Sequence, residues 1–500
     1  MVASTAERSR RGGAHRRQDS LFRNGLALVI NSAITSLLGS GYWVLAAHRT
    51  SRASVGEATA LVSALAALSM MSQLSLGGAL SSFLPRAGRH SRRLVLVSYL
   101  VTVGLGLVIG GGFAVIASRA NHSFGLLRPP LVTVEFAAAV AVWGVFSLQD
   151  SVLTGLRRAS IVPIENVIYS TVKLASLALV GGSLTALTLF ATWVVPAAVA
   201  LLPVNLLVWR RLLPSSKSTG DGEVDGFRRF LAGDTTGMFL SQIGVTLLPV
   251  LVVTRLGSVT GGAFGIAWML LQPLDLVAIN LGMSLTVEGA QHGADVAKLY
   301  RKVVGRSLPL VAVCVVVGCI GAPYVLGLFG AEYAKSATTV LRLLLLGSLG
   351  RAVAVFTLCA ARARRDTRQI IILQGLVACL VPTTAWILGG RYGLVGIGIA
   401  WAGSQLVIGA VAFVLRARTR AGEIEVKSDE DDSLRQPLAR RQQGGQRDIG
   451  LDNWIDSPTL PIYFGSSGYP ARGVDEGVSE PDPAPGGTAR RFRRAGLRPD

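Results

Sequence analysis

The stretch TVLRLLLLGSLGRAVAVFTLCAARARR, residues 339–365, decides the fold class, because it is apolar enough to lie in a membrane and yet carries Arg351 in the middle of its run. A helix needs about 20 predominantly apolar residues to cross the hydrocarbon core. A charged side chain at the bilayer centre costs about 3 kcal/mol or more unless it reaches water or a partner. The stretch therefore predicts a membrane-spanning helix whose arginine has a partner or a polar cavity.

The composition of the whole chain is that of a polytopic membrane protein. Of its 500 residues, 50% are hydrophobic and 16% are charged, and the mean hydropathy is +0.50. Soluble domains carry about a quarter charged residues. The formal net charge is +20, but Lys and Arg gather between apolar blocks. We interpret them as topology signals, and we expect no nucleic-acid partner.

About twelve apolar runs follow one another, and they predict an all-α polytopic membrane protein. Only GGSLT, residues 181–185, separates the fifth and sixth runs, so these two form either a tight hairpin or one broken helix. The expected limits of the runs are 22–47, 58–84, 94–118, 131–155, 161–181, 185–209, 229–254, 261–287, 303–327, 336–361, 369–390 and 393–416.

Lysine and arginine are concentrated in alternate loops between the runs. Because cytoplasmic loops carry the excess of these residues, the pattern predicts a multi-pass protein of the cytoplasmic (inner) membrane with both termini in the cytoplasm. The first run is long enough to span, which favours an uncleaved helix over a signal peptide. The expected domains are a basic cytoplasmic N-terminus (1–21), an N-terminal six-helix bundle (22–209), a cytoplasmic loop (210–228), a C-terminal six-helix bundle (229–416) and a disordered cytoplasmic tail (417–500).

The two halves of the chain resemble each other when one is slid over the other. HRTSRASVGEATALVSAL after the first run parallels TRLGSVTGGAFGIAWMLL after the seventh. The matched pairs, at nearly the same offset, are Arg49 with Arg255, Gly56 with Gly262, and Arg157 with Arg364. With six helices in each half, both repeats enter the membrane from the same side. The repeats are therefore parallel, and a substrate path is expected between them.

Four segments carry a resemblance to a known family. They are HRTSRASVGEATAL (48–61), SQLSLGGALSSFLPRAG (72–88), LTGLRRASIVPIENVI (153–168) and GLFGAEYAKSATTVLRLLLLGSLGRAV (327–353). Together with the order of six plus six helices, they resemble the polysaccharide (O-antigen/exopolysaccharide) flippase branch of the multidrug/oligosaccharidyl-lipid/polysaccharide (MOP) exporter superfamily. The lipid II flippases of that superfamily usually have two further helices, which makes them a poorer match.

The resemblance implies a MATE-like architecture, in which two bundles open as a V and give alternating access. It implies a transporter that flips a polyprenyl-diphosphate-linked oligosaccharide, a precursor of cell-surface polysaccharide, across the cytoplasmic membrane. The partners it implies are the lipid-linked glycan and membrane lipids, with a polysaccharide polymerase or glycosyltransferases as further candidates.

Two cations inside the predicted spans are the expected substrate-binding residues. Arg351 lies deep in the tenth run, and Lys173 lies near the middle of the fifth. We expect both to face one cavity between the halves and to hold the diphosphate, because a guanidinium grips phosphate oxygens in a fork and an ammonium adds a point charge. The alternative is an internal ion pair with Asp150, Glu165 or Asp275.

The sequence is consistent with two different roles for Asp275. It lies near the centre of the eighth run, beside Pro273 and three residues after Gln272. A carboxylate next to a proline kink could bind a coupling ion, H+ or Na+, or it could be the counter-ion of Arg351. The sequence leaves both open.

Asp150 lies near the inner end of the fourth run, close in sequence to two arginines. We expect it to pair with Arg157 or Arg158 at the membrane surface.

Other function classes have less support in the sequence. The chain contains no P-loop, HExxH or GxSxG motif, so no catalytic residue, cofactor or metal site is predicted. A MATE-like ion-coupled drug or metabolite antiporter is the main alternative, because fold does not settle substrate. An enzyme of polysaccharide assembly would need a larger outer loop or domain than this chain offers, and a scaffold would have no use for intramembrane charges.

Overall fold

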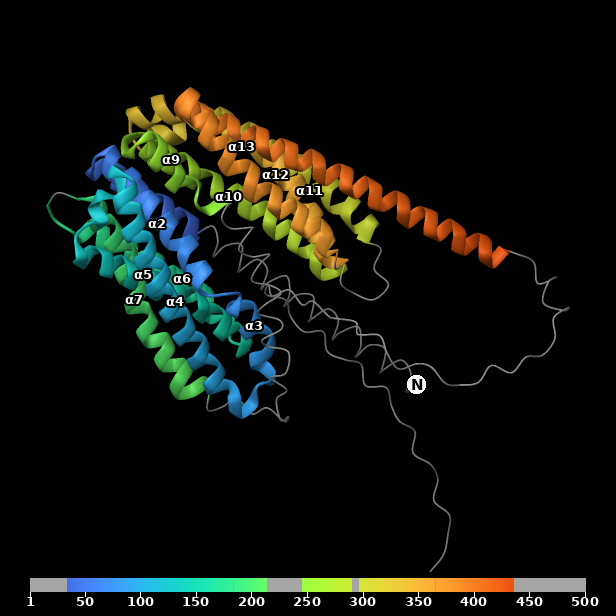
Figure 1. Cartoon of the computed structure of the whole chain (residues 1–500), viewed down its shortest axis with the longest axis horizontal. Coiled ribbons are helices and arrows are strands. Elements are labelled where there is room, and N and C mark those ends of the chain that lie inside the picture. The colour runs from blue at the N-terminus through green and yellow to red at the C-terminus, as the bar shows by residue number, and fades with distance from the viewer. Residues whose placement is uncertain (1–33, 183, 214–244, 290–295, 365, 436–500) are drawn as a thin grey trace, which may run out of the picture. The chain divides into compact units, whose positions relative to one another are not determined.

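The computed structural model describes residues 34–182, 184–213, 245–289, 296–364 and 366–435 (Figure 1). Throughout these residues the chain forms helices joined by turns, with no strand, so the predicted all-α class is confirmed. The expected N-terminal segment 1–21 and most of the loop 210–228 lie outside them. Residues 34–49 are helical, and the further helices are α2 (Arg52–Ser72), α3 (Leu76–Phe83), α4 (Ser91–Ala120), α5 (Pro130–Gly155), α6 (Ile161–Leu179), α7 (Ala186–Leu207), α9 (Leu248–Leu256), α10 (Ser258–Gly289), α11 (Val296–Gly327), α12 (Ala331–Ala363) and α13 (Thr367–Arg435).

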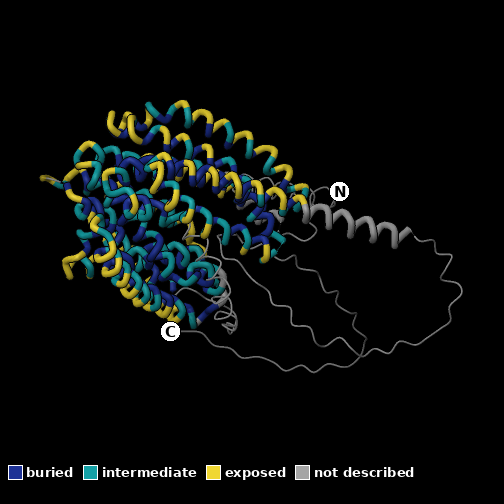
Figure 2. The backbone as a smooth tube through the Cα atoms, turned by 45° about the horizontal axis from the view of Figure 1, so that its top comes forward, coloured by how far each residue is buried: buried dark blue, intermediate teal, exposed yellow. Residues whose placement is uncertain are grey.

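Eight helices within the described residues are long and apolar enough to cross a membrane. Several of them expose large apolar side chains, for example Val108 and Ile116 of α4, which are 72% and 69% exposed. Figure 2 shows such exposed positions recurring along the outer sides of the helices. An apolar exterior of this extent is expected where lipid, and not water, surrounds the protein.

The sequence predicted the limits of most helices within a few residues, but it missed a break in the second run, 58–84. Here α2 ends at Ser72 and α3 begins at Leu76. Between them Leu74 and Ser75 have positive φ values of 44° and 59°, which no α-helix contains. The start of α2 also lies earlier than predicted, because the side chain of Ser51 caps the backbone amide of Ser54. GGSLT, by contrast, separates α6 from α7.

The last two runs, 369–390 and 393–416, are joined in α13. They are still distinct helices, because Gly393 between them has φ 59° and ψ −140°, a conformation open to glycine and strained for other residues. The backbone then stays helical to Arg435, although the sequence predicted a disordered tail from residue 417. The segment from 417 to 435 contains three Arg and three Glu residues, which are good helix formers, and Pro437 follows it. Residues 436–500 of the expected tail lie outside the described residues.

The two halves meet where α2 packs against α10 (Figure 1). Gly56 and Gly262, one of the matched pairs of the repeat, face each other there. A Cβ atom on Gly56 would collide with the backbone of Ser258 and Gly262. The Ser258 hydroxyl donates to Glu57 at 3.0 Å. The two repeats are thus in backbone contact at the end where α2 and α10 begin.

Further contacts between the halves lie at the same end. Arg52 forms an ion pair with Glu332 at 3.5 Å, and the Asn121 side chain donates to the Thr254 carbonyl at 2.8 Å. At the other end of the N-terminal half, a core cluster that includes Leu80, Leu148 and Val152 draws only on that half among the described residues.

Candidate functional site

Lys173 is buried among aromatic rings. It lies on α6, is 4% exposed, and its Nζ atom is 3.6 Å from the ring centroid of Trp193 on α7. The rings of Tyr169 and Tyr42 have their centroids at 5.2 and 5.3 Å. We call Tyr42, Tyr169 and Trp193 the aromatic box. Across the described part of the chain, no carboxylate lies within 4 Å of the Lys173 ammonium.

The aromatic box offsets the cost of burying this charge. A cation–π contact contributes about 2 kcal/mol when it is desolvated, and a lysine at mid-membrane costs about 3 kcal/mol on insertion scales. Three rings therefore suffice to keep the ammonium in place. An anionic oxygen would be a stronger partner for the ammonium than any of these rings, because it would accept a charge-assisted hydrogen bond.

Backbone carbonyls hold the box in position. The Tyr42 hydroxyl donates to the Leu189 carbonyl at 2.8 Å, and the Tyr169 hydroxyl donates to the Trp193 carbonyl at 3.1 Å. Tyr169 and Lys173 are four residues apart on α6, so they share one face of that helix. With their polar ends satisfied elsewhere, the tyrosines present their rings to the lysine.

Arg351 has a carboxylate partner. Its Nε atom lies 2.7 Å from Oδ2 of Asp275, which joins α12 to α10. The Arg351 side chain is 16% exposed and that of Asp275 is 6% exposed. The guanidinium also lies 5.6 Å from the ring centroid of Trp401. Of the counter-ions considered for Arg351, the structure thus places Asp275 beside it.

Small residues bring the helices close enough for this arrangement. A Cβ atom on Gly350 would collide with the backbone of Gln405, so α13 packs directly against α12 one residue before Arg351. The indole of Trp401 donates to the Leu344 carbonyl at 3.2 Å, which fixes its ring near the guanidinium. The GSLGR sequence is therefore a close-packing motif that also positions the charge.

The pairing leaves most of the guanidinium available. Asp275 accepts from Nε alone, whereas an arginine carries five N–H donors. As the more exposed member of the pair, Arg351 can bind a second anion on its Nη side without first losing Asp275.

The remaining predicted residues are distributed differently from expectation. Gln272 is exposed on α10, whereas Asp275 is buried. Asp150 does not pair with Arg157 or Arg158, so that expectation is wrong. The reason is local: α5 ends at Gly155, Arg157 takes a left-handed φ of 59°, and both arginines turn outward and are exposed.

The repeat arginines, in contrast, occupy matching places. Arg49 donates to the carbonyls of Leu177 and Val180, both at 2.7 Å, where α6 ends. Arg255 lies 4.9 Å from the ring centroid of Trp386, near the end of the eleventh predicted run. Each arginine therefore packs at the end of the fifth helix of its own half, which gives the sequence repeat a structural counterpart.

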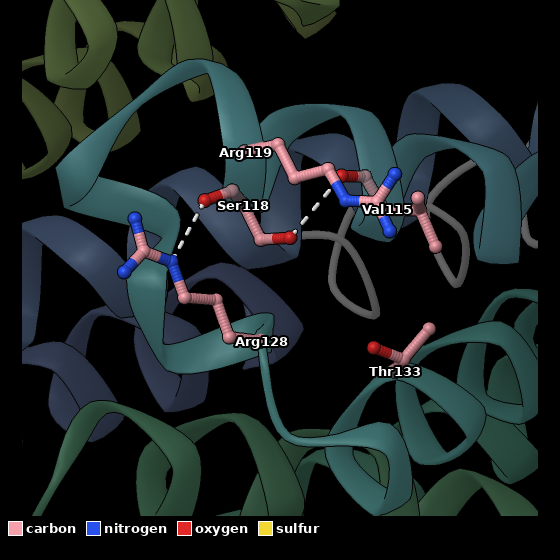
Figure 3. Close-up of a pocket in the computed structure, with 5 residues that line it drawn as sticks. All are labelled: Val115, Ser118, Arg119, Arg128 and Thr133. Carbon is pink, nitrogen blue, oxygen red and sulfur yellow. Dashed lines mark hydrogen bonds between the residues drawn. The ribbon is translucent and has the colours of Figure 1, made fainter.

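Lys173 lies in the N-terminal half and Arg351 in the C-terminal half, and within the described residues no hydrogen bond or ion pair joins the two. A surface pocket lies elsewhere, between the end of α4 and the start of α5, and is lined by Val115, Ser118, Arg119, Arg128 and Thr133 (Figure 3). In it Arg128 donates from Nε to the Ser118 carbonyl at 3.1 Å, while the Arg119 head lies on the other side of Ser118. Neither predicted substrate-binding residue lines this pocket.

Sequence reasoning missed a tryptophan beside each of the two cations. Trp193 and Trp401 are far from Lys173 and Arg351 along the chain, and neither sits in a motif. Their only signal is that they are large aromatic residues inside apolar runs. In the part of the chain that the structure describes, no group of three or more His, Cys, Asp or Glu side chains could hold a metal ion.

No protein-family model and no curated protein sequence matches the chain. Solved structures match it in fold. A multidrug-resistance MATE family transporter of the MOP superfamily, in an inward-facing conformation, has a TM-score of 0.62 at 16% identity, over 79% of this chain and 96% of its own. The lipid II flippase MurJ, in an inward closed conformation, has a TM-score of 0.59 at 13% identity, over 78% and 87%.

A third match is a MOP superfamily transporter from Pyrococcus furiosus, described as having a binding pocket of reversed polarity. Its TM-score is 0.50 at 14% identity, over 80% of this chain and 95% of its own. The chain thus has the fold of the MOP superfamily transporters, which are multi-pass membrane proteins. The predicted resemblance is confirmed at that level, and the polysaccharide flippase branch stays a prediction.

Proposed function

We propose that the chain is a transporter that flips a polyprenyl-diphosphate-linked oligosaccharide across the cytoplasmic membrane by alternating access. The observation that carries the proposal is Lys173, a buried cation that has no carboxylate partner among the residues the structure describes, inside a MOP fold. A lipid-linked sugar has an anionic diphosphate that needs such a cation, while its prenyl chain can stay in lipid.

The two clusters divide the task of binding. On binding, the Lys173 ammonium would give up contacts with the aromatic rings and donate a charge-assisted hydrogen bond to a phosphate oxygen. Arg351 would grip a second oxygen with its Nη groups while Asp275 holds Nε. For both to act on one headgroup the halves must move relative to each other, and the contact between α2 and α10 would open and close during that movement.

Asp275 gives the transporter a means of ion coupling. A diphosphate on Arg351 competes with Asp275 for the guanidinium, and a carboxylate released from its partner gains affinity for H+ or Na+. Binding of substrate and of a coupling ion would then be linked through one arginine.

The proposal also includes the membrane topology and the partners of the chain. Both termini would lie in the cytoplasm, and membrane lipids would surround the apolar exterior. A glycosyltransferase would supply the lipid-linked glycan and a polysaccharide polymerase would consume it.

A MATE-like drug or metabolite antiporter is the second candidate, and the buried carboxylate of Asp275 favours it. A cation-exporting protein would use such a carboxylate, together with aromatic faces, to bind its substrate. In this chain, however, Lys173 already occupies the aromatic box, which leaves the box suited to an anion.

The deciding experiment follows lipid-linked glycan in cells depleted of the protein. Wild type should prevent glycan from accumulating on the cytoplasmic face, whereas Lys173→Gln and Arg351→Gln should reduce flipping about 10- to 100-fold, because a lost hydrogen bond to a charged group costs about 1.5–3 kcal/mol. The matched control is Arg342→Gln on the same helix, whose exposed side chain donates to the Cys319 carbonyl. Unchanged glycan lipids on depletion would favour the antiporter.

A further inference from the structure

The surface pocket between the end of α4 and the start of α5 contains neither Lys173 nor Arg351, and its chemistry is not explained by the proposed function (Figure 3). Its volume is about 390 Å³, which lies in the range of about 300–1,000 Å³ that is usual for small-molecule sites. Its lining includes two arginines, Arg119 in the last turn of α4 and Arg128 just before α5. The pocket is therefore cationic.

One hydrogen bond fixes the Arg128 side chain at the pocket. Its Nε atom donates to the Ser118 carbonyl at 3.1 Å. The Nη groups carry the other four of the five N–H donors of an arginine, so this bond uses only a small part of the binding capacity of the guanidinium. Thr133, the other polar residue on the α5 side, donates its hydroxyl to the Leu127 carbonyl at 2.7 Å. The arginines are thus the groups that can bind an anion.

Acidic residues do not neutralise the pocket. Residues 118–134 contain no Asp or Glu. Glu135 follows Thr133 by two residues, which is about 200° around α5, so it lies on the opposite side of that helix from the pocket. Among the described residues, neither Arg119 nor Arg128 forms an ion pair. The two positive charges are therefore available to a ligand.

The two arginines are not explained as topology signals. In the proposed topology, the connection between α4 and α5 lies on the non-cytoplasmic side of the membrane. An excess of Lys and Arg is a feature of cytoplasmic loops. A basic residue in the last turn of α4 also complements the helix dipole, but that role needs Arg119 alone. A second arginine facing the same pocket indicates a different task.

The pocket adjoins the apolar outer surface of two membrane-spanning helices. Val115 of α4 lines it, and the neighbouring Ile116 is 69% exposed. On α5, Leu131 and Val134 are 70% and 63% exposed. A molecule bound here would meet cations at the helix ends and an apolar surface directly beside them. This order of chemistry matches a membrane lipid, whose charged headgroup is joined to acyl chains.

We propose that this pocket binds the anionic headgroup of a membrane phospholipid. Arg128, held by Ser118, supplies the fixed contact, because a guanidinium grips phosphate oxygens in a fork. The Arg119 head lies on the other side of Ser118 and supplies the second charge (Figure 3). The acyl chains run along the exposed apolar side chains of α4 and α5. The attraction of basic residues for anionic lipid adds to the apolar contact.

A lipid in this pocket would lie close to a contact between the two halves. Asn121, two residues after Arg119, donates its side-chain amide to the Thr254 carbonyl of the C-terminal half at 2.8 Å. A lipid that orders the connection between α4 and α5 would support this contact. The inference does not depend on the substrate of the chain. Its test measures lipid binding and not transport, so its failure and the failure of the proposed function are distinguishable.

The experiment measures the melting temperature of the purified full chain in detergent while phosphatidylglycerol is added. Phosphatidylcholine with the same acyl chains is the neutral comparison, and inorganic phosphate tests the headgroup chemistry without the chains. A ligand that binds only the folded state raises the melting temperature in a saturable way. We expect phosphatidylglycerol to do so, and we expect phosphatidylcholine and inorganic phosphate to have much smaller effects at the same concentrations.

Two variants locate the effect. Arg128→Gln and Arg119→Gln should each raise the half-saturating concentration of phosphatidylglycerol about 10-fold or more, since each removes a charged donor. Arg128→Gln also weakens the bond to Ser118, so Arg119→Gln keeps the test decisive if Arg128→Gln fails to fold. The matched control is Arg391→Gln, an exposed arginine of the C-terminal half, which should respond like the wild type.

Three results would overturn the proposal. Equal stabilisation by phosphatidylcholine would show that the anionic headgroup is not recognised. Equal stabilisation by inorganic phosphate would identify a site for the free anion and not for a lipid. A response to phosphatidylglycerol that is the same in wild type, Arg119→Gln and Arg391→Gln would place the lipid elsewhere on the protein.

Discussion

At the residue scale, the two intramembrane cations are stabilised in different ways. Arg351 is neutralised by Asp275, so the pair adds no net charge to its half. Lys173 has no carboxylate partner among the described residues and lies beside three rings. A salt bridge is satisfied before any substrate arrives, whereas an ammonium held by π faces still gains energy when an anionic oxygen reaches it. The lysine is therefore the more responsive of the two sites.

We expect Trp193→Leu to destabilise the protein chiefly through Lys173. The substitution removes the ring that lies 3.6 Å from Nζ, and a desolvated cation–π contact contributes about 2 kcal/mol. A cavity adds to the loss, so the charge-specific part is isolated by a double-mutant cycle with Lys173→Met, read from melting in detergent. The expected coupling energy is about 1–2 kcal/mol.

Trp193→Phe keeps a π face and serves as the control, with a coupling to Lys173 smaller than that lost in Trp193→Leu. A coupling energy near zero in both variants would mean that the ring packs beside the lysine without stabilising its charge.

The sequence identified both charged residues of this site but not their surroundings. A cation inside a long apolar run can be recognised from the sequence alone, because the free-energy cost of placing a charge in the membrane does not depend on how the helix is rotated. Which helix faces Lys173 does depend on rotation, and α7 is too uniformly apolar for its sequence to set that rotation. Hence Trp193 and Tyr42 could not be predicted, and Asp150 was assigned to neighbours in sequence that the turn after α5 directs away from it.

At the element scale, the apolar runs predicted helices well where a run ended in charged or turn residues. The limits of α5 at Pro130 and Gly155 lie within one residue of the prediction. The misses occurred where backbone geometry changes without a change of polarity. The break after α2, within residues 73–75, is such a place. The break at Gly393 in α13 was predicted, because the runs 369–390 and 393–416 end and begin there. The seventh run, 229–254, lies partly outside the described residues.

The packing of α2 on α10 depends on one glycine pair, and we expect Gly56→Val to disrupt it. A Cβ atom there would collide with backbone atoms of Ser258 and Gly262, which cannot move as a flexible side chain could. Overpacking of a tight interface costs about 1–3 kcal/mol, so the melting temperature should fall by several degrees.

Gly104→Val on α4 is the matched control, because no heavy atom lies within 4 Å of a Cβ atom placed there. It tests the intrinsic effect of valine in a helix without a steric clash. Equal melting temperatures for the two variants would show that the contact between α2 and α10 is looser than the structure has it.

At the scale of the whole molecule, the internal repeat explains why the two halves are in contact at the end where α2 and α10 begin. Arg49 and Arg255 fix the same helix end in each half, and the glycines that follow them bring α2 and α10 into contact. Because Gly56 and Gly262 occupy matching positions in the two repeats, the two halves meet at equivalent points of their structures. Alternating access requires this end to separate while the other closes.

We therefore expect a cross-link at this end to stop transport. Glu57 and Ser258 lie on opposite halves with side-chain oxygens 3.0 Å apart, so Glu57→Cys with Ser258→Cys should form a disulfide or accept a short thiol cross-linker. The background replaces the four native cysteines, Cys314, Cys319, Cys359 and Cys379, with alanine. Glycan-lipid flipping should be lost on cross-linking and return on reduction, because the halves can part again. Each single cysteine, treated in the same way, should stay active. If the cross-linked protein flips its substrate at the wild-type rate, this end does not open during transport, and access must instead change at another contact between the halves.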